Sequence, residues 1–211
     1  MSGDFEIHLT VRTDRAERLA AFAERHGLKY SLIVLDRGRN RQQPMVTIRG
    51  SGTLADQRRT ADRWARDLRA IGTHPSRVKI EAAPWNSGVP QTDEEAATEP
   101  ADRYFEHHVK LVLPDATPEH LIALTGLVVP YGARLSRNAR RQFTDGRHER
   151  FVTQRCHDVG APTARQRLDA LLAALRAGGH EIVEVEAEYV VRDDALHLDD
   201  GWLTKARRTR K

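Results

Sequence analysis

The chain has 211 residues, 39% of them hydrophobic and 30% charged, and a formal net charge of +4 at pH 7, which is typical of a globular protein with room for two domains of about 100 residues. The single cysteine, Cys156, excludes an internal disulfide and a zinc cluster built from cysteines. No apolar run is long enough to span a membrane and no signal-peptide pattern opens the sequence, so we expect a cytoplasmic protein without membrane partners.

The first half of the chain predicts the element order β-α-β-β-α-β. Apolar and polar residues alternate strictly over 4–12, which is the pattern of a half-buried strand. A helix capped by Asp14 and ending at His26-Gly27 follows it. Beyond that helix, we expect strands over 29–35, 44–49 and 77–83 and a second helix over 55–71.

The second half predicts the same order, with strands over 104–112, 133–137, 150–156 and 181–191 and helices over 118–129 and 163–177. We therefore expect a first repeat over 1–85, a Pro-, Gly- and acid-rich mobile linker over 86–102, a second repeat over 103–192 and a C-terminal tail over 193–211. The tail is expected to be a surface segment anchored by Trp202, with a disordered basic end.

Three short segments recur in the same order in both halves. Residues 5–8 (FEIH) return as 105–108 (FEHH), 46–49 (VTIR) as 152–155 (VTQR), and 80–82 (IEA) as 185–187 (VEA). Because the offsets are 100, 106 and 105 residues, the register slips only by loop-sized insertions. The repetition predicts a duplicated domain.

The predicted fold class is α+β, with tandem duplicated ferredoxin-like (βαββαβ) repeats whose antiparallel sheets are related by a pseudo-two-fold axis. In a ferredoxin-like sheet the first strand lies between the third and the fourth. Both helices cover one face, and the other face is open. The two sheets could pack with their open faces together or join at their edges, and the sequence does not decide between these arrangements.

Strand alternation places the repeated polar residues on the open faces. Because the apolar side chains must face the helices, the polar set of each half converges on three adjacent central strands. The first half contributes Glu6, His8, Thr47, Arg49, Lys79 and Glu81, and the second contributes Glu106, His108, Lys110, Thr153, Arg155, Glu184 and Glu186. The alternative is an ordinary solvent-facing sheet surface with cross-strand polar pairs.

Three kinds of chemistry suit this set of residues. Arg49 and Arg155, with the hydroxyls of Thr47 and Thr153, could bind a phosphate or another anion. A divalent cation, the one candidate cofactor, could bind to Glu6 with His8 and to Glu106 with His108. His8 and His108 could instead act as acid and base, with Glu81 and Glu186 in supporting positions.

The histidine strands also resemble those of a known enzyme family. His8-Leu9-Thr10 resembles the His-x-Thr/Ser strand motif that each lobe of the 2H phosphoesterases contributes to a central cleft. The resemblance implies that His8 and His108 are the acid and base of phosphoester hydrolysis and that Thr10 holds the phosphate. In the second half Lys110 stands where the family has Thr or Ser.

Basic hairpins follow the second strand of each half, with Arg37, Arg39 and Arg41 in the first and Arg137, Arg140, Arg141, Arg147 and Arg150 in the second. They could steer an anionic ligand, contact a nucleic acid backbone, or serve only as solvated loops. We therefore expect binding, and hydrolysis if the protein is an enzyme, of a phosphorylated or other anionic small molecule. The alternative is a non-catalytic module that binds nucleic acid or protein through these hairpins.

Overall fold

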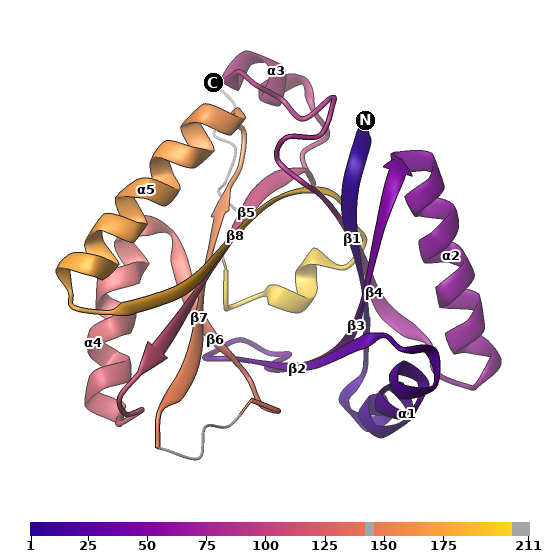
Figure 1. Cartoon of the computed structure of the whole chain (residues 1–211), viewed down its shortest axis with the longest axis horizontal. Helices are drawn as coiled ribbons and strands as arrows, with labels where there is room; N and C mark the ends of the chain where they lie inside the picture. The colour runs from indigo at the N-terminus through magenta and orange to yellow at the C-terminus, as the bar shows by residue number, and fades with distance from the viewer. Residues whose placement is uncertain (142–145, 204–211) are drawn as a thin grey trace.

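The computed structural model describes residues 1–141 and 146–203. Within these ranges, eight strands form a closed barrel in the order β1-β3-β2-β6-β7-β5-β8-β4, and every pairing is antiparallel. The helices lie outside the ring of strands, α1 and α2 on one side and α4 and α5 on the other (Figure 1). The chain is thus an α+β protein with an antiparallel sheet, as predicted.

The first half contains β1 (Ser2–Val11), α1 (Ala16–His26), β2 (Lys29–Leu35), β3 (Gln42–Thr53), α2 (Leu54–Ala70) and β4 (Pro75–Ala82). Asp14 does not cap α1; it lies in a 3-10 turn before the helix, because the first α-helical turn begins two residues later. Gly27 ends α1 in the left-handed conformation (φ 63°), which glycine adopts without steric cost. A capping box between Thr53 and Asp56 starts α2.

The second half contains β5 (Tyr104–Leu113), α4 (Pro118–Val128), β6 (Ala133–Asn138), β7 (His148–Cys156), α5 (Ala161–Ala177) and β8 (Glu181–Asp193). Thr117 caps α4 by accepting a hydrogen bond from the backbone N–H of His120, and Pro118 occupies the first turn, where its missing N–H costs nothing. Among the described helices, none is long and apolar enough to cross a membrane.

The two halves join at their edges. β1 lies between β3 and β4, and β5 lies between β7 and β8, which leaves β2 and β4 as the edges of the first half and β6 and β8 as those of the second. β2 pairs with β6, with Ile33 opposite Asn138, and β4 pairs with β8, with Lys79 opposite Asp193. Both seams close, so the faces that the helices leave uncovered form one common interior.

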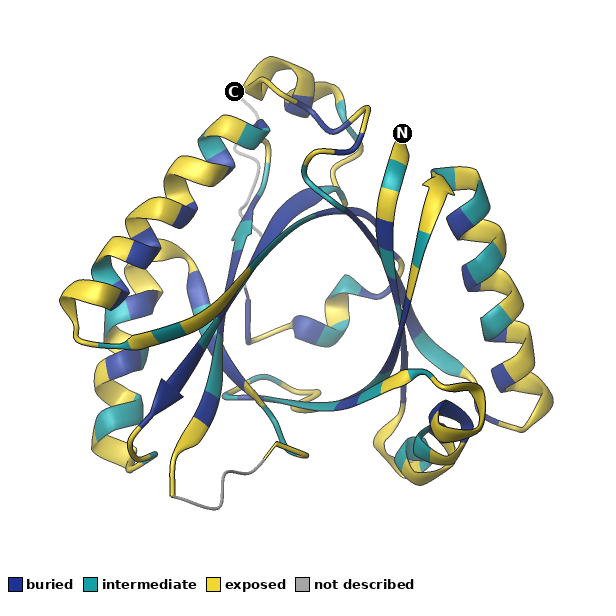
Figure 2. Cartoon of the chain, in the orientation of Figure 1, coloured by how far each residue is buried: buried dark blue, intermediate teal, exposed yellow. Residues whose placement is uncertain are grey.

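The apolar core lies between the helices and the outside of the barrel (Figure 2). Leu19 of α1 and Leu68 of α2 are fully buried against the outward residues of β1, such as Ile7. In the second half, Leu171 of α5 packs in a second cluster with Val109 of β5. Because the apolar residues of each strand face outward to these clusters, the alternate polar residues face the barrel interior.

The segment between the halves is packed rather than extended, contrary to the mobile linker that its composition predicted. It contains α3 (Asp93–Thr98) and buries Val89 and Ala96. It also docks on the start of α5, where the backbone N–H of Gly160 donates to Asp93 Oδ1 at 2.8 Å. A side chain at Gly160 would meet the Thr92 backbone within 2.6 Å, so this close approach requires glycine.

The C-terminal tail enters the barrel, which corrects the prediction of a surface segment. After β8, the 3-10 helix η3 (Leu196–Asp199) lies within the ring of strands (Figure 1). Trp202 is buried against Leu35 and Leu203, and its Nε1–H donates to the Leu135 carbonyl at 2.9 Å. The tail thus occupies one end of the barrel. The basic residues after 203, predicted to be disordered, lie outside the described residues.

Candidate functional site

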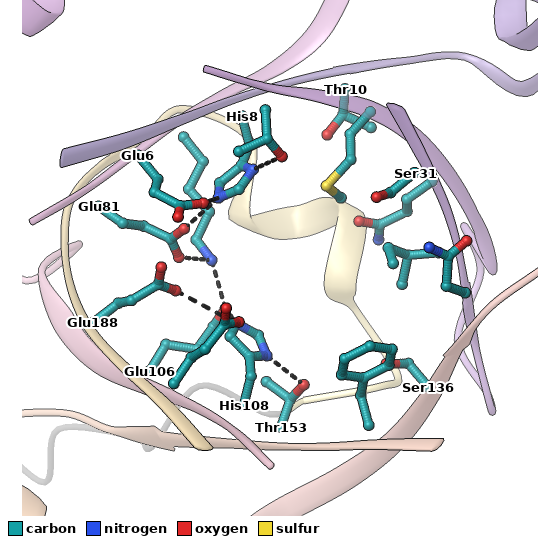
Figure 3. A pocket seen from close by; sticks show the side chains of 18 of the residues that line it. Glu6, His8, Thr10, Ser31, Glu81, Glu106, His108, Ser136, Thr153 and Glu188 are labelled. Atoms are coloured by element: carbon teal, nitrogen blue, oxygen red, sulfur yellow. Dashed lines mark hydrogen bonds and ion pairs between the residues drawn. The ribbon is translucent and has the colours of Figure 1, made fainter. Parts of the chain in front are cut away.

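The barrel interior contains a cavity of about 280 Å³ (Figure 3). Its lining includes every residue that the sequence predicted for the site: Glu6, His8, Thr10, Thr47, Arg49, Glu81, Glu106, His108, Lys110, Thr153, Arg155 and Glu186. The structure therefore brings the candidate residues of the two halves into one shared cavity.

Each histidine is held at one nitrogen by a threonine from the neighbouring strand. His8 Nδ1 lies 3.0 Å from Thr47 Oγ1, and His108 Nδ1 lies 3.1 Å from Thr153 Oγ1 (Figure 3). The register causes these contacts, because each histidine is directly opposite its threonine. A hydroxyl can donate or accept, so each threonine fixes the ring and allows either tautomer.

The other nitrogen of each ring faces a carboxylate. His8 Nε2 lies 2.5 Å from Glu81 Oε2, and His108 Nε2 lies 3.1 Å from Glu106 Oε1. Without a ligand, the simplest arrangement has Nε2–H donating to the glutamate and the threonine hydroxyl donating to Nδ1. The reactive nitrogens therefore face the interior, where a cation or substrate could replace the proton.

The two predicted anion-binding arginines are in different environments. Arg49 Nε donates to Glu6 at 2.7 Å, and its side chain is 68% exposed, so it retains free donors. The side chain of Arg155 is only 7% exposed, bonds Glu106 through Nε, and donates from Nη2 to Asp199 Oδ2 at 2.6 Å. Burial would raise the pKa of Glu106, but Arg155 and Lys79 hold it well below its ordinary value. The Arg155 charge is thus already compensated by carboxylates.

An ionic network at the tail end of the cavity was missed by sequence reasoning. Arg77 donates to both oxygens of Asp193, at 2.9 and 2.5 Å, and to both oxygens of Asp199, at 3.2 and 2.9 Å. Gln43 donates to Asp199 as well, at 2.8 Å. Burial would raise the pKa of Asp199, but Arg155 and Arg77 lower it to about 2. The acidic tail was the available signal, although nothing local placed it inside the barrel.

This network should make the protein sensitive to acid in a defined pH range. The pKa of Asp199 falls from 3.8 to about 2 in the folded chain, so its stabilisation is complete above about pH 4 and is lost as the pH falls towards 2. The difference corresponds to about 2 kcal/mol. Urea unfolding at pH 5, 4 and 3 should show that the free energy of unfolding falls more steeply with decreasing pH for the wild type than for Asp199→Asn. Parallel losses in the two proteins would contradict this assignment.

Glu188 is the second residue that sequence reasoning missed. The repeated fragments aligned Glu81 with Glu186, but the register pairs Glu6 with Glu81 and Glu106 with Glu188. The structural equivalent of Glu81 is therefore Glu188, two residues further on. A three-residue likeness cannot fix the register of strands of 8 and 13 residues that also carry bulges. Alternation along β8 was the signal that would have found Glu188.

Glu188 has an unusual electrostatic environment. Its nearest basic contact is His108 Nε2 at 3.8 Å, and no Lys or Arg of the described chain lies within ion-pair distance of it. Its side chain is only 15% exposed. Burial and the nearby Glu81 carboxylate raise the pKa of Glu188 well above its ordinary value. The centre of the cavity thus holds a carboxyl group without a Lys or Arg ion-pair partner in the described chain, and its raised pKa favours the protonated form.

The two basic hairpins lie at opposite ends of the barrel. In the first, Arg39 N–H donates to the Asp200 carbonyl at 3.4 Å, beside the tail. In the second, Arg141 lines the cavity, and its charge acts with those of Lys110 and Lys29 to lower the pKa of Glu184, at the mouth away from the tail. Part of this second hairpin, 142–145, lies outside the described residues. The hairpins therefore do not form one continuous surface.

No protein-family model matches the chain, and a search of curated proteins finds no match. Among solved structures, acetolactate synthase small subunit from Thermotoga maritima is 10% identical with a TM-score of 0.26, covering 90% of this chain and 95% of that one. Chlorite dismutase from Candidatus Nitrospira defluvii in complex with imidazole is 10% identical with a TM-score of 0.31, covering 90% and 92%. A mutant of that enzyme is 14% identical with a TM-score of 0.27, covering 94% and 93%. Likenesses at this level do not bear on the function of this chain.

The charges of the lining nearly cancel. Among the described residues around the cavity, Asp and Glu outnumber Lys and Arg by eight to seven. The basic side chains at the tail end are saturated by carboxylates, whereas Lys29 at the mouth forms no ion pair within the described chain. An anion would therefore find uncompensated positive charge near the mouth, and would need further positive charge in order to bind deeper.

Proposed function

We propose that the barrel interior binds a phosphorylated or other anionic small molecule and that, if the protein is catalytic, the reaction is phosphoester hydrolysis. The observation that carries the proposal is the cavity of about 280 Å³ inside the barrel, in which His8 and His108 both present Nε2 to the interior. A cavity of this volume suits a small ligand and excludes a nucleic acid duplex. The proposed site is therefore inside the barrel rather than on the hairpins.

In this proposal the mouth and the centre of the cavity have different roles. Lys29, Arg49 and Arg141 line the mouth, where an anion would first meet them. His8 and His108 lie further inside and would transfer protons to and from the phosphoester oxygens. Arg155 is assigned to positioning, since its donors already serve Glu106 and Asp199.

We also propose that the chain arose by duplication of one ferredoxin-like unit, with the copies related by a pseudo-two-fold axis. Both halves have the order β-α-β-β-α-β, apart from short 3-10 turns. The His–Thr pair and the Glu–Arg pair occur at equivalent register positions in β1–β3 and β5–β7. A shared ancestral site would explain why the same polar residues recur at equivalent positions in the barrel interior of both halves.

Ligand-induced stabilisation tests the proposed function. Phosphate, pyrophosphate and a panel of phosphorylated metabolites would be titrated while the melting temperature is followed. A ligand at 100 times its Kd adds about 2.7 kcal/mol of stability, or roughly 5–10 °C for a chain of this size. Lys29→Ala/Arg49→Ala should weaken binding at least tenfold, whereas Arg18→Ala/Arg66→Ala, which removes equal charge from the outer helices, should not.

Two results would contradict the proposal. One is the absence of a shift with every ligand in the wild-type protein. The other is an equal loss of binding in the mouth and outer-helix variants, together with a steep dependence on salt, which would indicate a diffuse electrostatic surface instead of a cavity site.

A further inference from the structure

We propose that Glu188 bridges two divalent cations inside the barrel, one held with Glu6 and His8 and the other with Glu81 and His108. The proposal concerns a pair of metal sites and stands independently of the anion-binding function. It also differs from the ligand set that the sequence suggested, because Glu188 and Glu81 take the place of Glu106.

The geometry brings two sets of ligand atoms together around one carboxylate. One atom from each of Glu6, His8 and Glu188 lies within 4.8 Å of the others, and the same holds for Glu81, His108 and Glu188. Zinc bonds of about 2.0–2.2 Å allow two ligands of one ion to lie at most about 4.4 Å apart. Small side-chain rotations would therefore bring each set into coordination distance. Figure 3 shows the five side chains converging from β1, β4, β5 and β8.

The register puts glutamates directly opposite one another, which is costly without a cation. Glu6 is opposite Glu81, and Glu106 is opposite Glu188. Like charges in directly opposed positions destabilise a sheet.

Neighbouring basic groups compensate most of these glutamates. Arg49 pairs with Glu6, and Lys79 pairs with Glu81 and Glu106. For Glu188 the described chain provides no Lys or Arg ion-pair partner, so either a proton or a bound cation must compensate its charge.

The same contacts explain why Glu106 is not a ligand. Arg155 bonds one oxygen of Glu106, and Lys79 Nζ lies 2.5 Å from the other. The residue is almost fully buried and its charge is fully compensated. A cation would have to displace Arg155 or Lys79 to bind Glu106. It can approach Glu188 from the cavity. At Glu81 it would replace only the contact between Oε2 and the His8 ring, because Lys79 bonds the other oxygen.

The histidines are prepared for coordination through Nε2. Thr47 and Thr153 contact the two Nδ1 atoms, and by accepting Nδ1–H they would leave each Nε2 free to bind a metal. Nε2–H of the metal-free state, which faces glutamate oxygens, would be replaced by the cation. Imidazole with carboxylates suits Mn²⁺, Zn²⁺ and Fe²⁺ better than Ca²⁺. A bridging carboxylate is compatible with the separation of about 3.5–4 Å that is common in two-metal sites.

Calorimetric titration of the EDTA-treated full chain with MnCl₂ and with ZnCl₂, in buffer without phosphate, tests the proposal. We expect two cations per chain, and an exchange-coupled Mn²⁺ pair by electron paramagnetic resonance. Glu188→Gln should weaken both sites more than a hundredfold, while His8→Ala should remove one cation and leave the other. The matched control is Glu186→Gln, since Glu186 lines the same cavity from the same strand but belongs to neither ligand set.

The metal-free proteins provide a second measurement. Glu188→Gln removes a half-buried carboxyl group that has no Lys or Arg ion-pair partner in the described chain, so its melting temperature without metal should equal or exceed that of the wild type. A folded variant that fails to bind metal then shows that the loss of binding is not a loss of structure. Three outcomes overturn the proposal: no cation binding by the wild type, equal losses in Glu188→Gln and Glu186→Gln, or two Mn²⁺ ions without exchange coupling. Because phosphate is absent throughout, none of these outcomes bears on the anion-binding proposal.

Discussion

Arg77→Met is expected to lower the free energy of unfolding by about 3–5 kcal/mol. Arg77 is buried and donates to both carboxylate oxygens of Asp193 and of Asp199. The substitution keeps most of the side-chain volume but leaves two buried acidic groups short of a partner. For a chain of this length the melting temperature should fall on the order of 10 °C. Urea denaturation at pH 7, followed by circular dichroism, measures the loss.

A triple variant separates the cost of unpaired charge from the value of the network itself. Arg77→Met combined with Asp193→Asn and Asp199→Asn removes all three charges and should recover at least half of the loss, because replacing a whole buried network is far less costly than breaking it. Tyr104, whose hydroxyl donates to Asp193 at 3.0 Å, can still donate to the amide oxygen. If Arg77→Met proves as stable as the wild type, the network does not hold the tail in place.

Lys79→Met is expected to destabilise the metal-free protein by a similar amount and to increase its affinity for Mn²⁺. Burial would lower the pKa of Lys79, but Glu106 and Glu81 hold it well above its ordinary value, so the ammonium is charged at neutral pH. Its removal leaves both glutamates with less compensation in an interior that already contains Glu188. A cation should then bind about ten times more tightly, which corresponds to about 1.4 kcal/mol.

The opposite signs of these two effects make the result diagnostic. Unfolding measured in EDTA should show the destabilisation of Lys79→Met, and unfolding with saturating Mn²⁺ should show partial recovery. The double variant Lys79→Met/Glu106→Gln also neutralises Glu106, a carboxylate outside the proposed ligand sets. Its stability without metal should therefore exceed that of Lys79→Met, while metal binding persists. If Mn²⁺ affinity falls in Lys79→Met, the interior does not bind cations as proposed.

Strand alternation was enough to predict which side chains face the cavity. The inward positions of β1, such as Glu6 and His8, follow from a period of two within a single strand, and the helices determine which face is covered. The pairing of β2 with β6 and of β4 with β8 could not be predicted in this way, because the residues involved are far apart in the sequence. The importance of Glu188 depends on this long-range register.

The hairpins show a second limit of arguments from internal repetition. They follow equivalent strands, yet β2 and β6 run antiparallel across the seam, so their following loops point to opposite ends of the barrel. Equivalent places in the sequence are therefore not neighbours in space. The tail was unpredictable for a related reason. Asp199 is an acidic residue, and its place inside is explained by three distant partners, Gln43, Arg77 and Arg155.

The position of β8 determines when this protein can complete its fold. β8 ends at Asp193 and lies between β5 and β4, so the last of the described strands to leave the ribosome must join the two halves. Until then, β4 of the first half and β5 of the second each lack a partner along one edge, and such edges favour pairing with other chains. Closure depends on contacts between distant residues, and topologies of this kind fold slowly. We therefore expect nascent chains that stop before β8 to aggregate, and a molecular chaperone that shields the two open edges to increase the yield.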